Sequence, residues 1–147
     1  MKKIIANYTT LTGRCPLPQR RFLGYHQCRW SYFTKEEVLE LVGNCEKYNI
    51  PLEFVHLDID YMERYKVFTT SDERFPNIEQ MIEDLKAKGV KIICIIDPGV
   101  KAEEGYFVYE EGLENGYFAT QNGEVYHNAV WPGDSVFPQF TLSETRK

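Results

Sequence analysis

Two carboxylates, Asp58 and Asp60, follow an apolar run that begins at Phe54. The pattern predicts a β-strand that ends in an Asp-x-Asp pair. In an α/β protein, side chains that do chemistry gather where parallel strands end, because the loops there line an open crevice. The pair is therefore a candidate for binding a ligand or a metal ion. The alternative is structural: one carboxylate caps the loop and the other pairs with an arginine.

Two further predicted strands also end in polar or aromatic residues. The segment Phe22–Trp30 starts with apolar residues and ends in Arg29 and Trp30. The segment Val90–Ile96 has an unbroken apolar end, which predicts a strand buried on both faces, and the acidic residue Asp97 follows it.

Helical patterns separate these strands. Thr34 and Glu37 form a capping box, and apolar residues then recur at helical spacing until Asn49. A second amphipathic pattern runs from Ile78 and ends at Gly89, where a helix C-terminal glycine belongs. Strands that alternate with helices predict an α/β fold, either a (β/α) barrel or a doubly wound parallel sheet. No glycine-rich phosphate fingerprint follows any strand, which disfavours nucleotide binding.

The two ends of the chain do not fit this alternation. Residues 1–22 lack clear periodicity and contain Gly13 and two prolines, so we expect an extended linker. Residues 101–140 are rich in glycine and aromatic residues, which predicts a long loop with short hairpin strands. A loop of that length after a barrel strand is usually functional. Thr141–Glu144 predicts the start of another helix.

Composition narrows the class of protein. The chain has 147 residues, is 43% hydrophobic and carries a net charge of -5, which is typical of a globular domain and argues against a nucleic-acid partner. No stretch approaches the length of a membrane span, and the N-terminus lacks a signal-peptide pattern. The four cysteines form no metal-binding motif, so we expect reduced, mostly buried thiols and a cytoplasmic location.

Four motifs in order resemble the front half of the catalytic barrel of glycoside hydrolase family 31, the α-glucosidase family. They are Leu23–Tyr32, Leu57–Met62, Ile95–Gly99, and Val130–Gly133 with Phe137-Pro138. The resemblance runs from about Leu11 to the end of the chain. Single motifs of this kind are weak signals, whereas four in register are specific. The family pattern after the second strand also fits Thr69 and Arg74-Phe75-Pro76.

The resemblance implies an activity and a set of sugar contacts. Members of this family release terminal α-linked glucose from oligosaccharides, with retention of configuration, by means of a (β/α)8 barrel that follows a β-sandwich. The chain would be a partial barrel, with residues 1–22 as the linker from the sandwich and residues 23–147 as the first three or so βα units plus a long β-rich loop. The matching positions imply that Asp58 accepts hydrogen bonds from sugar hydroxyls, and that Ile59, Trp30, Ile95 and Trp131 contact the ring.

The resemblance also implies what lies outside this chain. In this family the nucleophile and the acid/base come from later barrel strands, so no catalytic residue, metal ion or cofactor is expected here, and the chain alone should be inactive. Asp60 and Asp97 are expected to stabilise their loops. The chain departs from the family pattern at Thr70 and Gln139, where Trp and Asp are frequent, and at Arg20-Arg21 before the first strand. The departures at Thr70 and Gln139 concern local loop packing more than the fold.

Two other functions fit parts of the sequence. A non-catalytic carbohydrate-binding module could use the same residues. A metal-dependent nucleotide-sugar transferase could use Asp58-Ile59-Asp60 as its metal-binding motif, although the chain is acidic and lacks a phosphate cradle. The sequence does not indicate an oligomeric state.

Overall fold

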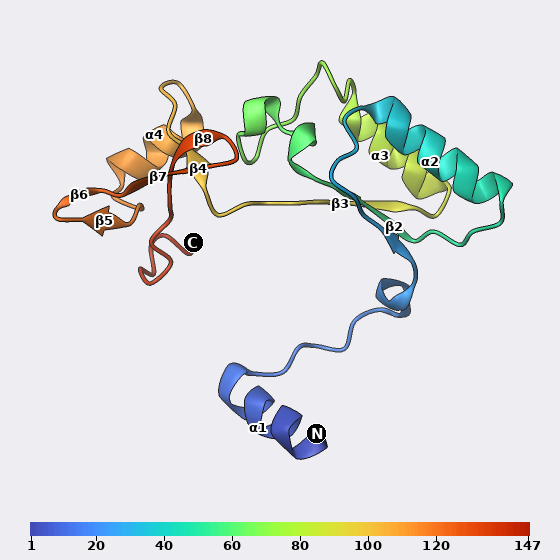
Figure 1. Ribbon diagram of the computed structural model, residues 1–147, viewed down its shortest axis with the longest axis horizontal. Coiled ribbons are helices and arrows are strands. Elements are labelled where there is room, and N and C mark those ends of the chain that lie inside the picture. Colours follow the sequence, from blue (N-terminus) through green and yellow to red (C-terminus); the bar gives the residue numbers. More distant parts are fainter.

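The computed structural model describes residues 1–147 and contains helices, a parallel sheet and two antiparallel sheets (Figure 1). The helices are α1 (Lys2–Thr12), α2 (Lys35–Lys47), α3 (Ile78–Ala87) and α4 (Phe107–Glu114). The strands are β1 (His26–Gln27), β2 (Phe54–Leu57), β3 (Lys91–Cys94), β4 (Val100–Lys101), β5 (Thr120–Gln121), β6 (Glu124–Val125), β7 (His127–Val130) and β8 (Gly133–Val136). Short 3-10 helices occupy Arg20–Leu23, Ile59–Tyr61 and Glu63–Tyr65.

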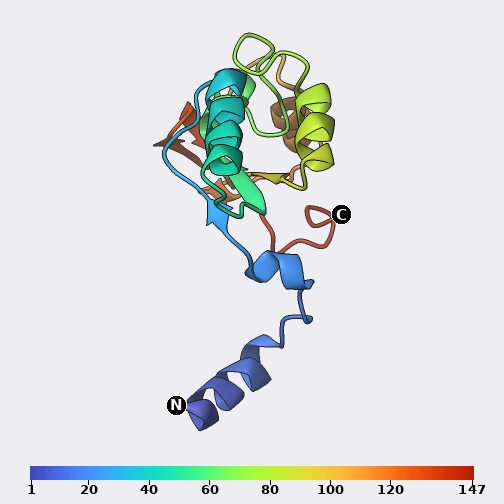
Figure 2. The same cartoon turned by 90° about the vertical axis from the view of Figure 1, so that its right-hand side faces the viewer.

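The first half of the chain forms the predicted α/β layers. Strands β1, β2 and β3 make a parallel sheet in that order, with Phe54 opposite both His26 and Lys91. Helices α2 and α3 lie side by side on one face of this sheet (Figures 1 and 2). Between them the buried core contains Val38 and Val42 from α2, Val55 and Leu57 from β2, and Ile78, Met81 and Leu85 from α3. The alternation of strands and helices predicted from the sequence is confirmed.

Local chemistry sets the ends of the two covering helices. The Thr34 side chain accepts a hydrogen bond from the backbone N–H of Glu37, which satisfies one of the free donors at the start of α2. After α3, Gly89 has a φ of +83°, a left-handed conformation that favours glycine. These signals bring the chain back to the sheet at the start of β3.

The opposite face of the sheet carries aromatic and imidazole rings. Because side chains alternate along a strand, Phe54 and His56 point away from the face where Val55 and Leu57 meet the helices. Phe54 stacks on Phe22, with ring centroids 4.9 Å apart. The side chains of His26 and His56 form a hydrogen bond between ring nitrogens 3.0 Å apart.

The second half of the chain forms a separate group of elements at the other end of the long axis (Figure 1). Strands β4, β8 and β7 make an antiparallel sheet, β5 and β6 make a hairpin, and α4 packs beside them. The short hairpins were predicted, whereas α4 was not, because its single buried position is a glycine, Gly112. Phe118 packs against Gly112, where a Cβ atom would lie 2.9 Å from Cε1 of the ring and still nearer to two other ring carbons.

Several predictions about individual segments of the chain were wrong. The N-terminal residues form α1, which buries none of its residues and stands apart from the body of the molecule in both views (Figures 1 and 2). Strand β1 is only two residues long, because a 3-10 helix occupies part of the predicted strand. Strand β3 is not buried on both faces, since it is the edge strand of its sheet and no second layer covers its other face. The segment Thr141–Glu144 forms turns in place of a helix.

Two other whole-chain properties can be read from the structure. None of its helices combines the length and the apolar character that crossing a bilayer requires. All four cysteines are free thiols, but Cys15 and Cys28 are exposed, so the prediction that the thiols are mostly buried was wrong for half of them.

Candidate functional site

A small cavity of about 280 Å³ lies where the ends of the parallel strands meet the β7–β8 hairpin. Its lining consists of six residues: Trp30, Asp58, Ile59, Ile95, Asp97 and Trp131. The five residues singled out from the sequence are all among them. They come from four segments that are far apart in the chain, and the parallel order of β1, β2 and β3 brings three of those segments to one edge of the sheet.

Asp58 follows β2 and begins the short 3-10 helix Ile59–Tyr61. Its Oδ1 atom accepts a hydrogen bond of 2.8 Å from the backbone N–H of Ile59, which holds the carboxylate at the cavity wall. No protein donor bonds to Oδ2, so this oxygen is available to a ligand hydroxyl. A carboxylate fixed by one hydrogen bond and open on its other oxygen is a suitable acceptor for a polyhydroxylated molecule.

Two tryptophan side chains supply apolar surface to the cavity. Trp30 is 77% exposed and Trp131 is 72% exposed, so neither indole is used in the core. Trp131 lies in the tight turn of the β7–β8 hairpin, where Gly133 has a φ of +100°. An exposed indole can pack its face against the C–H groups of a sugar ring, which is an apolar surface flanked by hydroxyls.

Ile95 and Asp97 follow β3 and form the third side of the cavity. The backbone carbonyl of Ile95 accepts a hydrogen bond of 2.8 Å from the Tyr61 hydroxyl, which ties this segment to the end of β2. Burial is the main reason that the pKa of Tyr61 is raised to about 12, and the nearby Cys94 and Asp97 add to the effect. The Tyr61 hydroxyl therefore remains a donor at neutral pH. The carboxylate of Asp97 makes no hydrogen bond or ion pair, and the expectation that it fixes its own loop was wrong.

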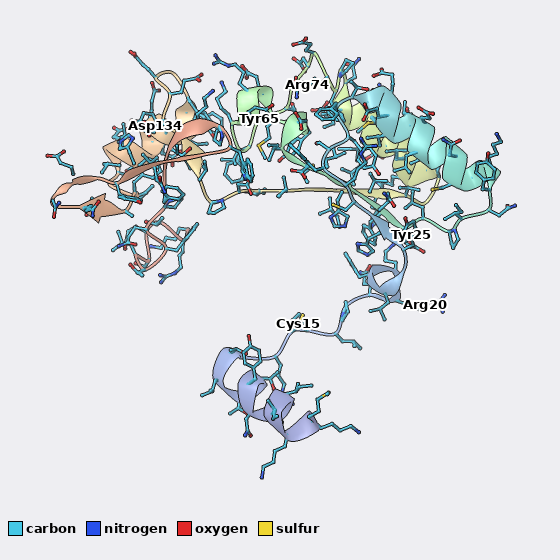
Figure 3. The ribbon with its side chains drawn as sticks, viewed as in Figure 1. Cys15, Arg20, Tyr25, Tyr65, Arg74 and Asp134 are labelled. Atoms are coloured by element: carbon cyan, nitrogen blue, oxygen red, sulfur yellow. The ribbon has the colours of Figure 1, made fainter.

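Asp60 has a different role from Asp58. It is only 3% exposed, and its carboxylate forms an ion pair with Arg74. The Tyr65 hydroxyl lies 3.5 Å from the same carboxylate oxygen, and Figure 3 shows Tyr65 and Arg74 on the loop between β2 and α3. Asp60 does not line the cavity. It stabilises the loop, as the sequence analysis predicted.

The structure also has features that the sequence analysis did not find. Trp131 borders a second, larger cavity of about 870 Å³, which is lined mostly by polar residues of the loop between β2 and α3. The three histidines lie outside the small cavity: His26 and His56 pair on the sheet, and His127 pairs with Asp134, labelled in Figure 3, at 2.9 Å. No group of three potential metal ligands occurs anywhere in the structure.

Sequence comparison gives a consistent family assignment. The family model of the glycosyl hydrolases family 31 TIM-barrel domain matches residues 15–147. Alpha-glucosidase 2 of Bacillus thermoamyloliquefaciens is 48% identical over 147 residues, which is 99% of this chain and 19% of that protein. Neutral alpha-glucosidase AB of Homo sapiens is 37% identical over 139 residues, which is 94% of this chain and 15% of that protein. The chain thus spans less than a fifth of the length of these relatives.

Solved structures agree with this assignment. A chain of the ER glucosidase II heterodimeric complex, which consists of the catalytic subunit and the binding domain of the regulatory subunit, superposes with a TM-score of 0.91 at 35% identity, covering 99% of this chain and 16% of that one. The family 31 alpha-glucosidase from Bacteroides thetaiotaomicron gives a TM-score of 0.85 at 38% identity, covering 97% of this chain and 24% of that one. The resemblance seen in the four sequence motifs is confirmed, and the chain belongs to glycoside hydrolase family 31, within the TIM-barrel domain of that family.

Proposed function

We propose that this chain forms one wall of the first sugar subsite of a retaining α-glucosidase, which releases terminal α-linked glucose from oligosaccharides. The observation that carries the proposal is the small cavity, because it gathers Asp58, Ile59, Trp30, Ile95 and Trp131 from segments that are far apart in the chain. Its volume of about 280 Å³ is at the lower end of the range for small-molecule sites, which suits a single sugar ring.

Each part of the cavity matches one part of a glucose ring. The free oxygen of Asp58 accepts a hydrogen bond from a ring hydroxyl, and a charged acceptor makes that bond stronger than a neutral one would. Trp30 and Trp131 cover C–H faces, and Ile59 and Ile95 exclude water beside them. In a glycosidase such contacts with the non-reacting hydroxyls position the scissile bond and can be used to stabilise the transition state.

The bond-breaking groups of the proposed enzyme lie outside this chain. Retaining hydrolysis needs two carboxyl groups about 5–5.5 Å apart on either side of the scissile bond, one as nucleophile and one as acid/base. Asp60 is occupied by Arg74, and Asp58 is assigned to binding. We therefore expect the chain alone to bind α-glucosides without hydrolysing them.

A partial barrel accounts for the architecture around the cavity. The order of β1, β2 and β3 follows the chain, and α2 and α3 cover one face of the sheet, as in the first βα units of a (β/α)8 barrel. The outer edges of β1 and β3 carry no partner strand. In a closed barrel both edges would be paired, and the face that bears Phe54 and His56 would point to the interior.

Two alternative functions can be separated from this one. A non-catalytic carbohydrate-binding module would use the same cavity and would bind maltose at millimolar concentration or tighter, whereas one wall of a larger subsite should bind it more weakly. The metal-dependent transferase needs both carboxylates of Asp58-Ile59-Asp60 to face a metal ion, whereas Asp60 is buried against Arg74. That contact argues against the transferase.

The test combines binding with turnover. Titration calorimetry of the chain with methyl α-D-glucoside should show weak, saturable binding, and Asp58→Asn should weaken it about tenfold, because a charged acceptor is lost. Asp72→Asn, the same change at an exposed aspartate outside the cavity, serves as the matched control. Incubation with an aryl α-glucoside should release no aglycone. Robust release that Asp58→Ala abolishes would contradict the assignment of catalysis to other segments.

A further inference from the structure

Asp97 is the one residue of the cavity lining that the sequence analysis did not assign to a ligand. We propose that Asp97 is a second substrate-binding carboxylate, which accepts a hydrogen bond from another hydroxyl of the sugar that Asp58 holds. The inference rests on the proposed function. It adds one binding residue to the same subsite and a preference for neutral sugars over acidic ones.

The backbone after β3 places Asp97 on the cavity side. Ile95 and Asp97 are two residues apart, and side chains with that spacing share a face of an extended chain. Pro98 follows directly and restricts Asp97 to the extended region of backbone conformation. Both Ile95 and Asp97 line the cavity, and the hydrogen bond from Tyr61 to the carbonyl of Ile95 fixes the segment that carries them.

The carboxylate of Asp97 has no partner within the chain. It makes no hydrogen bond and no ion pair, although it is partly withdrawn from solvent. By contrast, Asp60, one of the two acids after β2, is bonded to Arg74 and Tyr65. Because a partly buried carboxylate without a donor is unfavourable, a ligand hydroxyl placed in the cavity would supply the missing hydrogen bond.

The charge of the cavity restricts the class of ligand. Asp58 and Asp97 are its only ionisable residues, and no lysine, arginine or histidine lines it. Two carboxylates without a cation favour neutral hydroxyl donors and repel a carboxylated or phosphorylated sugar. The cavity should therefore discriminate between a neutral α-glucoside and the corresponding uronic acid, although the two differ only at C6.

The experiment extends the calorimetric titration to Asp97→Asn and Asp97→Ser, with Asp58→Asn and Asp72→Asn alongside. Circular dichroism first establishes that each variant is folded. Methyl α-D-glucoside should bind at least about fivefold more weakly to both Asp97 variants, because a charged hydrogen bond is lost, and equally well to Asp72→Asn. The methyl glycoside of α-D-glucuronic acid should bind the wild type more weakly than the neutral glucoside, and Asp97→Asn should narrow that difference.

The outcomes separate this inference from the proposed function. If Asp58→Asn weakens binding and both Asp97 variants bind as the wild type does, Asp97 is not a sugar contact, whereas the proposed function stands. If the wild type binds no α-glucoside, or if no cavity substitution changes its binding, the proposed function and the inference are both overturned. Preferential binding of the uronic acid by the wild type would overturn the inference alone.

Discussion

Substitution of Gly112 by alanine tests the packing that supports the second half of the chain. In an exposed helix interior, Gly→Ala stabilises by about 1 kcal/mol, because alanine has the higher helix propensity. Gly112 is buried in α4 against the ring of Phe118, which is itself only 5% exposed. A methyl group there would lie 2.9 Å from Cε1 of the ring and nearer still to two other ring carbons, so the ring or the helix must move.

The size of the effect follows from two opposing contributions. Forcing a methylene-sized group into a packed core costs about 1–3 kcal/mol. The gain in helix propensity offsets about 1 kcal/mol of that cost. Because Phe118 packs on α4 through both Gly112 and the stacked ring of Tyr109, we place Gly112→Ala in the upper half of the range, about 1–2 kcal/mol less stable than the wild type. For a chain of this length, that loss lowers the melting temperature by roughly 3–8 °C.

Urea and thermal denaturation followed by circular dichroism measure this change. Gly43→Ala in α2 is the matched control, because no neighbouring atom lies within 4 Å of the added methyl group, and it should stabilise the chain by up to about 1 kcal/mol. The double variant Gly112→Ala with Phe118→Leu removes part of the ring and should be less destabilised than the two single changes added together. If Gly112→Ala is as stable as Gly43→Ala, the contact between Gly112 and Phe118 is not as described.

Three further predictions concern hydrogen bonds and charge. Asp60→Asn removes the anionic partner of Arg74, which is partly exposed and can be hydrated. Urea denaturation should therefore show a free energy of unfolding lower by about 1–3 kcal/mol, and an unchanged value would refute the structural role of this carboxylate. Tyr106→Phe leaves a buried backbone carbonyl without its 2.6 Å hydrogen bond and should cost about 1–2 kcal/mol in the same assay, so an equal denaturation midpoint would contradict the contact. Burial, and to a lesser extent the nearby His26, lowers the pKa of His56 below its ordinary value of 6.5, so the unfolded chain binds this proton more readily than the folded chain. The stability that neutral His56 contributes is therefore fully present above pH 6.5, and it is lost as the pH falls through the lower pKa of the folded state. On going from about pH 7.5 to about pH 5.5, the melting temperature should therefore fall more for the wild type than for His56→Gln. An equal fall in the two proteins would show that protonation of His56 does not change the stability of the fold.

The sequence predicted the elements that position the cavity because their signals were local and mutually consistent. The capping box at Thr34, the helical pattern that starts at Ile78 and the glycine at position 89 each specify one boundary, and together they leave little freedom for the strands between them. The members of the cavity were not predictable from spacing. The resemblance to a family supplied them, and the parallel order of the strands brings them together.

The elements that were missed had weak or conflicting signals. In α1, apolar residues recur at Ile4, Tyr8 and Leu11 with helical spacing, but the turn residues that follow suggested an extended segment for the whole region. The helix α4 has only eight residues, and its buried position is a glycine, which adds nothing to an apolar pattern.

Properties that depend on contacts between distant segments could not be predicted from the sequence either. The bond between His26 and His56 follows from the register of β1 on β2. Whether the carboxylate of Asp97 is bonded or free depends on neighbours that residue identity alone does not specify. Such features need the three-dimensional structure, because they are set by which segments meet and in what register.

The most direct test of the sugar-binding cavity uses the two tryptophans of the chain, Trp30 and Trp131, both of which line it. Nitrogen-15 NMR resolves one indole N–H signal for each, and Trp30→Phe assigns them. On titration with methyl α-D-glucoside, both signals should move along one saturable curve, and Asp58→Asn should shift that curve to about tenfold higher concentration. Indole signals that stay fixed at concentrations that saturate any other response, or that move independently of Asp58, would contradict a common sugar site formed by these residues.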